Sequence, residues 1–63
     1  MEGSVTKWLD KKGFGFIQGD DGFVYFLHIK KIAGQIHPNI GQKVTFDALE
    51  GKKGMQAVNA ELK

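Results

Sequence analysis

Lys12-Gly13-Phe14-Gly15-Phe16-Ile17 is the stretch that decides the fold, and its pattern is that of a β-strand. Successive side chains of a strand point to opposite faces, so Phe14 and Phe16 share one face. Gly15 and Ile17 then share the other. Glycine is a poor strand residue because it packs nothing and loses much conformational entropy. Its alternation with two phenylalanines therefore indicates a specific use for this strand.

A second strand is expected shortly afterwards, over 25–29, and in it Phe26 and His28 share a face. If the two strands pair, three aromatic rings and an imidazole lie side by side. We call this group the aromatic platform: Phe14, Phe16, Phe26 and His28. Lys12 and Lys30 flank it. Flat rings among cations suit the stacked bases and the phosphate backbone of a nucleic acid.

The chain has 63 residues, the length of one small and marginally stable domain. It contains no cysteine, which excludes disulfides and thiolate metal ligands and fits a reducing compartment. We expect no signal peptide, because no apolar run follows Met1, and no stretch is long enough to span a bilayer. The expectation is a cytoplasmic monomer with no membrane partner.

The formal net charge is +2, and all nine basic residues are lysines. This balance removes the self-repulsion that an acidic domain would experience near phosphate. The absence of arginine argues against base-specific readout, which often uses its bidentate guanidinium.

Alternating apolar residues and closely spaced glycines predict strands and no long helix. The expected strands span 5–10, 13–18, 23–29, 42–50 and 55–62. The longest connection, 30–40, is expected to hold one helical turn near 31–33. Five short strands predict a small closed or nearly closed barrel, because closure removes exposed strand edges. Its expected core is Val5, Ile17, Tyr25, Leu27, Ile32, Val44, Phe46, Val58, Ala60 and Leu62.

An aromatic residue on a strand usually belongs to the core, but Ile17 and Leu27 already supply the core side of these two strands. Exposing the three platform phenylalanines forgoes roughly 1.5–3 kcal/mol each relative to burial. A contiguous exposed apolar patch of this kind usually marks a binding site. Gly13 and Gly15 would let the chain twist and let a ligand approach the rings, and a barrel corner at the same place is compatible with that use.

Other side chains are expected around the platform. If Val5 points into the core, the alternation along the strand places Thr6 and Trp8 on the platform side. The alternative is that Trp8 is a large side chain that fills the core. The ring of His28 can stack on a base or hydrogen-bond to it. His37, in a loop beside a proline, is given no role. A track for phosphates is expected from Lys7, Lys12, Lys30 and Lys53.

These residues resemble the cold-shock domain, a five-stranded OB-fold barrel that binds single-stranded RNA and DNA. The stretch 12–17 is similar to the first ribonucleoprotein motif of that family, and 25–29 is similar to the second. The stretches 41–46 and 54–59 resemble its last two strands. The resemblance implies an all-β, five-stranded antiparallel OB-fold barrel formed by residues 1–63 as a single domain. The candidate nucleic-acid-binding residues are Lys7, Trp8, Lys12, Phe14, Phe16, Phe26, His28, Lys30, Lys53 and Gln56.

The sequence departs from the family pattern at several positions. Lys7 occupies the family's tryptophan position, Ile29 replaces a stacking phenylalanine, and Val24 replaces an aspartate. The connection after Ile29 is shorter and carries Lys30 and Lys31 instead of an aromatic residue. Stacking is thus exchanged for charge, and we expect binding that is weaker per base and more dependent on salt than is typical of the family.

The function expected from these observations is single-stranded nucleic-acid binding by an RNA chaperone. A protein-interaction module that uses the same aromatic patch is the alternative, and it would bind with little salt dependence. An enzyme is disfavoured, because the only histidines are His28 and His37 and the only serine is Ser4. We expect no catalytic residue, metal, cofactor or small-molecule substrate.

Overall fold

The structure, a computed structural model, describes residues 1–52 and 54–63. Its strands are β1 (Glu2–Leu9), β2 (Phe14–Gly19), β3 (Val24–His28), β4 (Lys43–Gly51) and β5 (Gly54–Leu62). Two short 3-10 helices, η1 (Ile29–Lys31) and η2 (Ala33–Gln35), lie between β3 and β4. Within this described part of the chain, no helix has the length and apolar character needed to cross a membrane.

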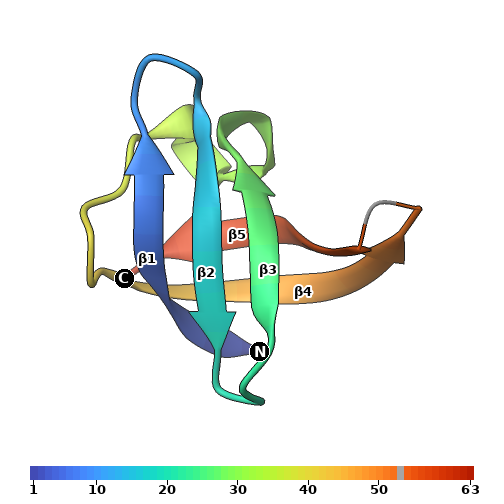
Figure 1. Ribbon diagram of the computed structural model, residues 1–63. Helices are drawn as coiled ribbons and strands as arrows, with labels where there is room; N and C mark the ends of the chain where they lie inside the picture. Colours follow the sequence, from blue (N-terminus) through green and yellow to red (C-terminus); the bar gives the residue numbers. More distant parts are fainter. Residues whose placement is uncertain (53) are drawn as a thin grey trace.

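The strands close into a barrel in the order β1-β2-β3-β5-β4, which confirms the predicted closed five-stranded architecture. In Figure 1 β1, β2 and β3 lie side by side in front, and β4 and β5 cross behind them. The predicted antiparallel barrel is confirmed with one exception, because β3 and β5 pair in parallel through Phe26 and Gln56. A closed ring with an odd number of strands cannot alternate direction throughout, so one parallel pair is unavoidable.

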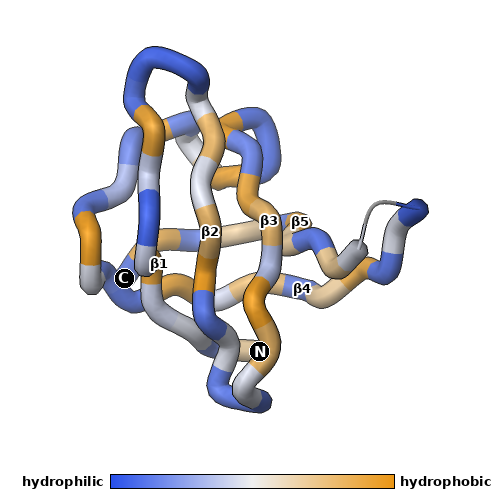
Figure 2. Tube along the Cα trace, viewed as in Figure 1, coloured by the Kyte–Doolittle hydropathy of each residue, from blue (hydrophilic) through white to orange (hydrophobic). Residues whose placement is uncertain are grey.

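Among the residues that the structure describes, nine hydrophobic side chains are buried in the barrel core, and most of the predicted core is confirmed. They are Val5, Ile17, Tyr25, Leu27, Ile32, Val44, Phe46, Ala57 and Ala60. Figure 2 shows hydrophobic segments along β2 and β3 and a hydrophilic turn between β1 and β2.

The core prediction is wrong at Val58, which is only half-buried while its neighbour Ala57 is buried. The cause is a β-bulge in β5. Thr45 pairs with Glu61 and Asp47 pairs with Val58, so β5 holds one residue more than β4 over this interval. The extra residue is absorbed near Asn59, which has a left-handed φ of 51°. The bulge shifts the alternation and turns Ala57 inward. Leu62 packs against the core but is itself only partly buried.

A second β-bulge lies in β1, and it changes which side chains reach the outer face. Val5 pairs with Ile17, but Lys7 pairs with the next residue of β2, Phe16. Thr6 is therefore the extra residue, and the alternation of inward and outward side chains reverses beyond it. The strand also begins earlier than predicted, at Glu2.

Candidate functional site

The four side chains of the aromatic platform lie on the outer face of β2 and β3. Phe14 pairs with His28 and Phe16 pairs with Phe26, so cross-strand neighbours share that face. All four are partly exposed, whereas the residues between them are buried on the inner face. The outer face of these strands is the one turned toward the reader in Figure 1. Regular alternation along two paired strands is thus sufficient to bring the four rings together.

The rings contact one another through Phe26, which occupies the centre of the group. Its centroid lies 5.3 Å from that of Phe14, with the planes tilted by 38°. The centroid of Phe16 lies 6.0 Å away on the other side, edge to face at 71°. These separations are typical of favourable aromatic pairs, so the rings support one another while all three residues remain partly exposed.

The imidazole of His28 is fixed by the backbone that follows it. Its Nδ1 accepts a hydrogen bond of 3.1 Å from the backbone N–H of Lys30, at the start of η1. An accepting Nδ1 carries no proton, so in the neutral ring the proton lies on Nε2. His28 therefore presents an N–H donor, held in a defined orientation, at the end of the aromatic platform.

A pocket of about 350 Å³ lies at the edge of the platform, between Phe16, Phe26, Met55 and Gln56. The parallel pairing of β3 with β5 places Gln56 directly beside Phe26. The pocket thus combines two aromatic faces with a carboxamide, which can both donate and accept hydrogen bonds. A planar ring with polar edges, such as a base, suits these walls.

The candidate lysines lie around the platform. Lys7 pairs with Phe16 across β1 and β2 and shares its outer face. Lys12 lies in the turn after β1, Lys30 lies in η1, and all three are exposed. Over residues 1–52 and 54–63, none of them forms an ion pair with a carboxylate. Lys53, the fourth candidate, lies outside the described residues.

The structure contradicts the predicted orientation of Trp8. The bulge at Thr6 pairs Trp8 with Gly15, so its side chain lies on the inner side of the sheet, opposite the platform. There the half-buried indole packs against the core. Its Nε1 donates a 3.0 Å hydrogen bond to Nδ1 of His37. Lys7 takes the outward position that was expected for Trp8.

The position of Trp8 also explains Gly15. A Cβ atom at Gly15 would lie 2.1 Å from the carbonyl oxygen of Lys7 and 2.6 Å from the indole of Trp8. The missing side chain therefore makes room for β1 and for Trp8 on the inner side. The expectation that Gly15 opens the platform to a ligand is replaced by this packing requirement.

Two apolar side chains extend the outer face beyond the predicted set. Leu9 pairs with Phe14, and Val24 continues the alternation that runs through Phe26. Val24 is 57% exposed. Strand alternation from Phe26 could have identified Val24, whereas Leu9 was hidden by the bulge in β1.

The turn between β2 and β3 is held by the hydroxyl of Tyr25, which donates to the carboxylate of Asp21. This hydrogen bond raises the pKa of Tyr25 and lowers the pKa of Asp21. Asp21 also accepts a 3.1 Å hydrogen bond from the backbone N–H of Phe23. The turn thus fixes the register of the two strands that carry the platform. No cluster of three metal-ligating side chains occurs among residues 1–52 and 54–63.

Comparison with known proteins identifies the same family as these motifs. The sequence model of the "'Cold-shock' DNA-binding domain" matches residues 1–62. Cold shock protein 2 of Lactiplantibacillus plantarum is 41% identical over 64 residues, covering 97% of each chain. Cold shock protein CspC of Bacillus subtilis is 39% identical over the same length and coverage. Temperature acclimation protein A of Pseudomonas fragi is 50% identical over 50 residues, covering 76% of this chain and 85% of the relative.

Proposed function

Because the chain belongs to the cold-shock domain family, a family of nucleic-acid-binding proteins, we propose that it binds single-stranded RNA or DNA and acts as an RNA chaperone. The observation that carries this proposal is the aromatic platform. Its three phenylalanine rings and one imidazole are contiguous and partly exposed on the outer face of β2 and β3. Rings arranged in this way accept unpaired bases by stacking.

The proposed mechanism is competition for stacking. Each base stacked on an aromatic side chain contributes roughly 1–3 kcal/mol. A step of duplex DNA contributes about 1.4 kcal/mol, so the gain on the protein matches the loss from a weak duplex. A strand held on Phe14, Phe16 and Phe26 cannot pair, and transient hairpins stay open without any supply of energy.

Polar groups around the platform have separate tasks in this proposal. The Nε2–H of His28 and the carboxamide of Gln56 hydrogen-bond to base edges at two ends of the ring cluster. Lys7, Lys12 and Lys30 pair with phosphates, and Lys53 is assigned to the same group from its sequence position alone. Lysine neutralises phosphate as a compact charge and does not impose a base, so we expect broad sequence tolerance.

We also propose that the protein acts as a monomer in the cytoplasm. The strands form a closed barrel, which limits the strand edges available for pairing with a second copy. The absence of cysteine fits a reducing compartment.

The proposal is tested by fluorescence anisotropy with a labelled single-stranded oligonucleotide and with the matched duplex. We expect clear preference for the single strand, because duplex bases are already stacked on each other. Equal affinity for both forms would indicate charge attraction alone. If the protein binds neither the single strand nor the duplex, and instead binds an apolar peptide with little dependence on salt, a protein-interaction module would be favoured.

The chaperone step needs a separate readout. A hairpin with a fluorophore and a quencher at its two ends should brighten when the protein is added without ATP. Phe16→Ala should lose this effect while remaining folded. If the hairpin stays closed at concentrations that saturate an unstructured strand, the protein binds single strands but is not a chaperone.

A further inference from the structure

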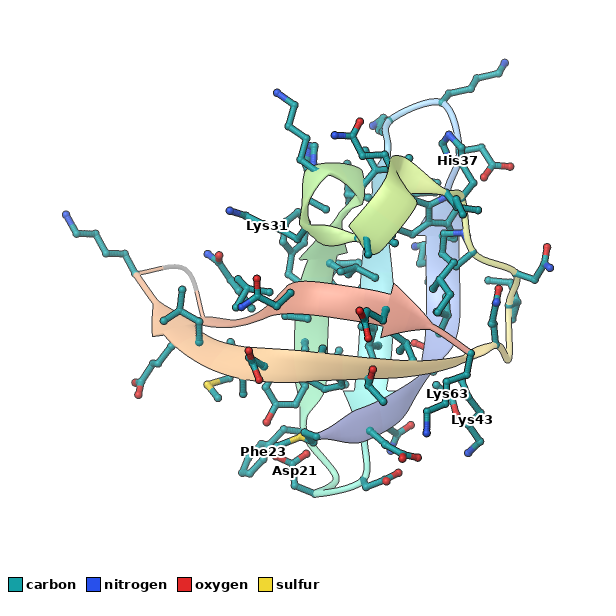
Figure 3. All side chains as sticks on the ribbon, turned by 180° about the vertical axis from the view of Figure 1, so that it is seen from behind. Asp21, Phe23, Lys31, His37, Lys43 and Lys63 are labelled. Carbon is teal, nitrogen blue, oxygen red and sulfur yellow. The ribbon has the colours of Figure 1, made fainter. Side chains whose placement is uncertain are left out.

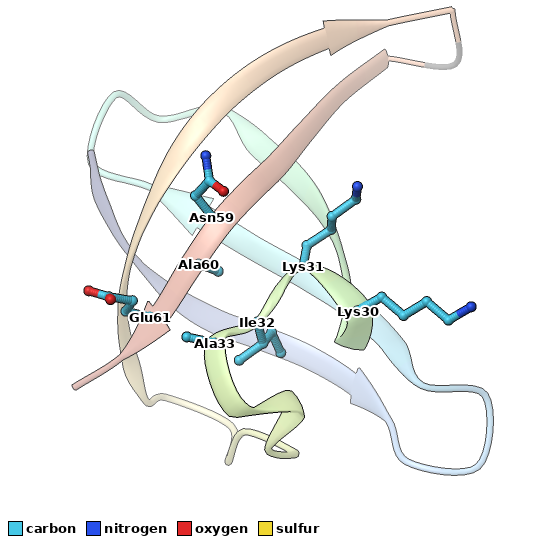
Figure 4. A pocket seen from close by; sticks show the side chains of 7 residues that line it. All are labelled: Lys30, Lys31, Ile32, Ala33, Asn59, Ala60 and Glu61. Carbon is cyan, nitrogen blue, oxygen red and sulfur yellow. The ribbon is translucent and has the colours of Figure 1, made fainter.

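A second pocket, of about 410 Å³, lies next to the platform on the edge formed by η1 and β5. Figure 4 shows Lys30 and Lys31 extending from η1 on one side of it and Glu61 extending from β5 on the other. The backbone bridge between Ile32 and Ala60 joins the two walls. Apart from Lys30 and Asn59, the residues that line this pocket belong neither to the stretches that resemble the family nor to the candidate nucleic-acid-binding set.

The pocket continues the platform along both of its walls. On one wall, His28 is followed directly by η1, which carries Lys30 and Lys31. On the other wall, Gln56 and Asn59 are three residues apart on β5, a distance of about 10 Å along a strand. A single-stranded nucleic acid that leaves the platform past Phe26 and Gln56 therefore reaches this pocket next.

The chemistry of the lining favours a phosphate over a base. No aromatic side chain lines the pocket, so it offers no surface for stacking. Lys30 and Lys31 are exposed, and over residues 1–52 and 54–63 neither pairs with a carboxylate. The carboxamide of Asn59 is already oriented by a 3.0 Å hydrogen bond to Asp47. Two negative charges oppose an anion, Glu61 in the lining and Asp47 beside Asn59.

We propose that this pocket binds a backbone phosphate of a single strand that extends beyond the platform, with Lys31 as its main cation and Glu61 as a charge that weakens the site. The proposal rests on the proposed function and adds to it a phosphate subsite next to the platform. It predicts opposite changes in affinity for the two sides of the pocket, weaker binding when Lys31 is neutralised and tighter binding when Glu61 is neutralised.

The test compares strands of about 4 and about 16 nucleotides, the two ends of the range of site sizes for one OB fold. Lys31→Gln should weaken binding of the long homopyrimidine strand and leave the short one unchanged. The slope of log affinity against log salt for the long strand should flatten by about 0.7, which corresponds to about fivefold in affinity between 1 M and 0.1 M salt. Glu61→Gln should tighten the long strand only.

Lys43→Gln is the matched control, because Lys43 is also an exposed lysine. It lies at the opposite end of the molecule from Lys31, as Figure 3 shows. It should change neither strand's affinity. Thermal unfolding of each variant checks that the exposed substitutions leave the fold intact.

Unchanged long-strand affinity in both Lys31→Gln and Glu61→Gln would overturn the subsite. An equal loss for the short and the long strand in Lys31→Gln would overturn it as well, because Lys31 would then act at the platform. A wild-type protein that does not prefer single strands would overturn the proposed function itself, an outcome that is visible before any variant is made.

Discussion

The indole Nε1 of Trp8 donates a 3.0 Å hydrogen bond to Nδ1 of His37. This Nδ1 of His37 also lies 3.4 Å from the carboxylate of Asp10. The two contacts require different protonation states. Nδ1 accepts from the indole only when it carries no proton, and it donates to Asp10 only when it carries one. Trp8 and Asp10 therefore compete for a single atom that joins β1 to the loop before β4.

The hydrogen bond between Trp8 and His37 can be tested by substitution. His37→Ala removes the acceptor of the indole N–H, so the Nε1 proton resonance of Trp8 should move in NMR spectra. Asp10→Asn leaves that acceptor in place and should move the resonance less. An unchanged resonance in His37→Ala would show that the indole does not donate to His37.

A matched pair of phenylalanines separates binding from folding. Phe16→Ala should cost about 1–3 kcal/mol of single-strand binding, the range for one lost stacking partner. Phe46 is 3% exposed and belongs to the core, so Phe46→Ala should cost about 3–5 kcal/mol of folding free energy. Denaturant unfolding and anisotropy titrations measure the two quantities. If Phe16→Ala destabilises the fold as much as Phe46→Ala does, the Phe16 ring is a core residue and not a binding surface.

The packing of Trp8 on Gly15 predicts a large effect of a single methyl group. Gly15→Ala would place Cβ against the backbone of Lys7, and overpacking of this kind costs about 1–3 kcal/mol. Gly51→Ala is the control, because its Cβ would meet the mobile end of the Gln56 side chain, 2.8 Å away, which can move aside. Unfolding midpoints should fall for the first variant and remain close to wild type for the second. Equal midpoints for the two would contradict the close approach at Gly15.

The lysines beside the platform should act as phosphate partners that do not read bases. With three or four contacts at about 0.7 each, the slope of log affinity against log salt for a single strand should be roughly −2 to −3. Lys12→Gln should weaken a homopyrimidine and a mixed strand alike and flatten that slope by somewhat under one unit. A salt series on both strands provides the measurement. A loss confined to one sequence would mean that Lys12 contacts a base.

The hydrogen bond between Tyr25 and Asp21 predicts how stability depends on pH. The folded-state pKa of Asp21 lies below its ordinary value of 3.8, so this carboxylate stabilises the fold above that pH and loses its effect as the pH falls through the folded-state pKa. The pKa of Tyr25 is raised above 10.0, so its contribution is present below that pH and lost as the pH rises through the raised pKa.

Tyr25→Phe removes this hydrogen bond and keeps the ring in the core. The difference in unfolding free energy between wild type and Tyr25→Phe should therefore be constant near neutral pH and shrink at both extremes. Chemical denaturation over a series of buffers measures it. A difference that is independent of pH would show that the hydroxyl contributes nothing through Asp21.

The faces of β2 and β3 could be predicted from sequence because both strands are regular. Alternation alone places Ile17 and Leu27 inside and Phe16 and Phe26 outside. The same reasoning failed where a strand contains a bulge. Thr6 and the region of Asn59 each add one residue to a strand, and this reverses every later position.

The bulge at Thr6 has no local sequence signal that could be used in advance, whereas Asn59 is a residue type that tolerates the left-handed φ found at the second bulge. Thr6 is an ordinary strand residue, and its extra position follows from how β1 curves between β2 and β4 to close the barrel. The neighbourhood of Gln56 and Phe26 was equally inaccessible, because it depends on a parallel pair between strands distant in sequence. Contacts that form when the barrel closes depend on all five strands together. They cannot be predicted from the sequence of any one short segment.

The parallel pair of β3 and β5 also has a consequence for biosynthesis. Phe26 is translated well before Gln56, and the wall beside the rings is completed only when β5 docks. The three front strands can pair as soon as they are made, but contacts between distant segments form late and at a high entropic cost. A nascent chain in which β5 has not yet left the ribosome therefore has the rings of Phe16 and Phe26 but lacks the neighbouring strand that supports them. The pocket between Phe16, Phe26, Met55 and Gln56 is therefore complete only after β5 has been synthesised and has docked.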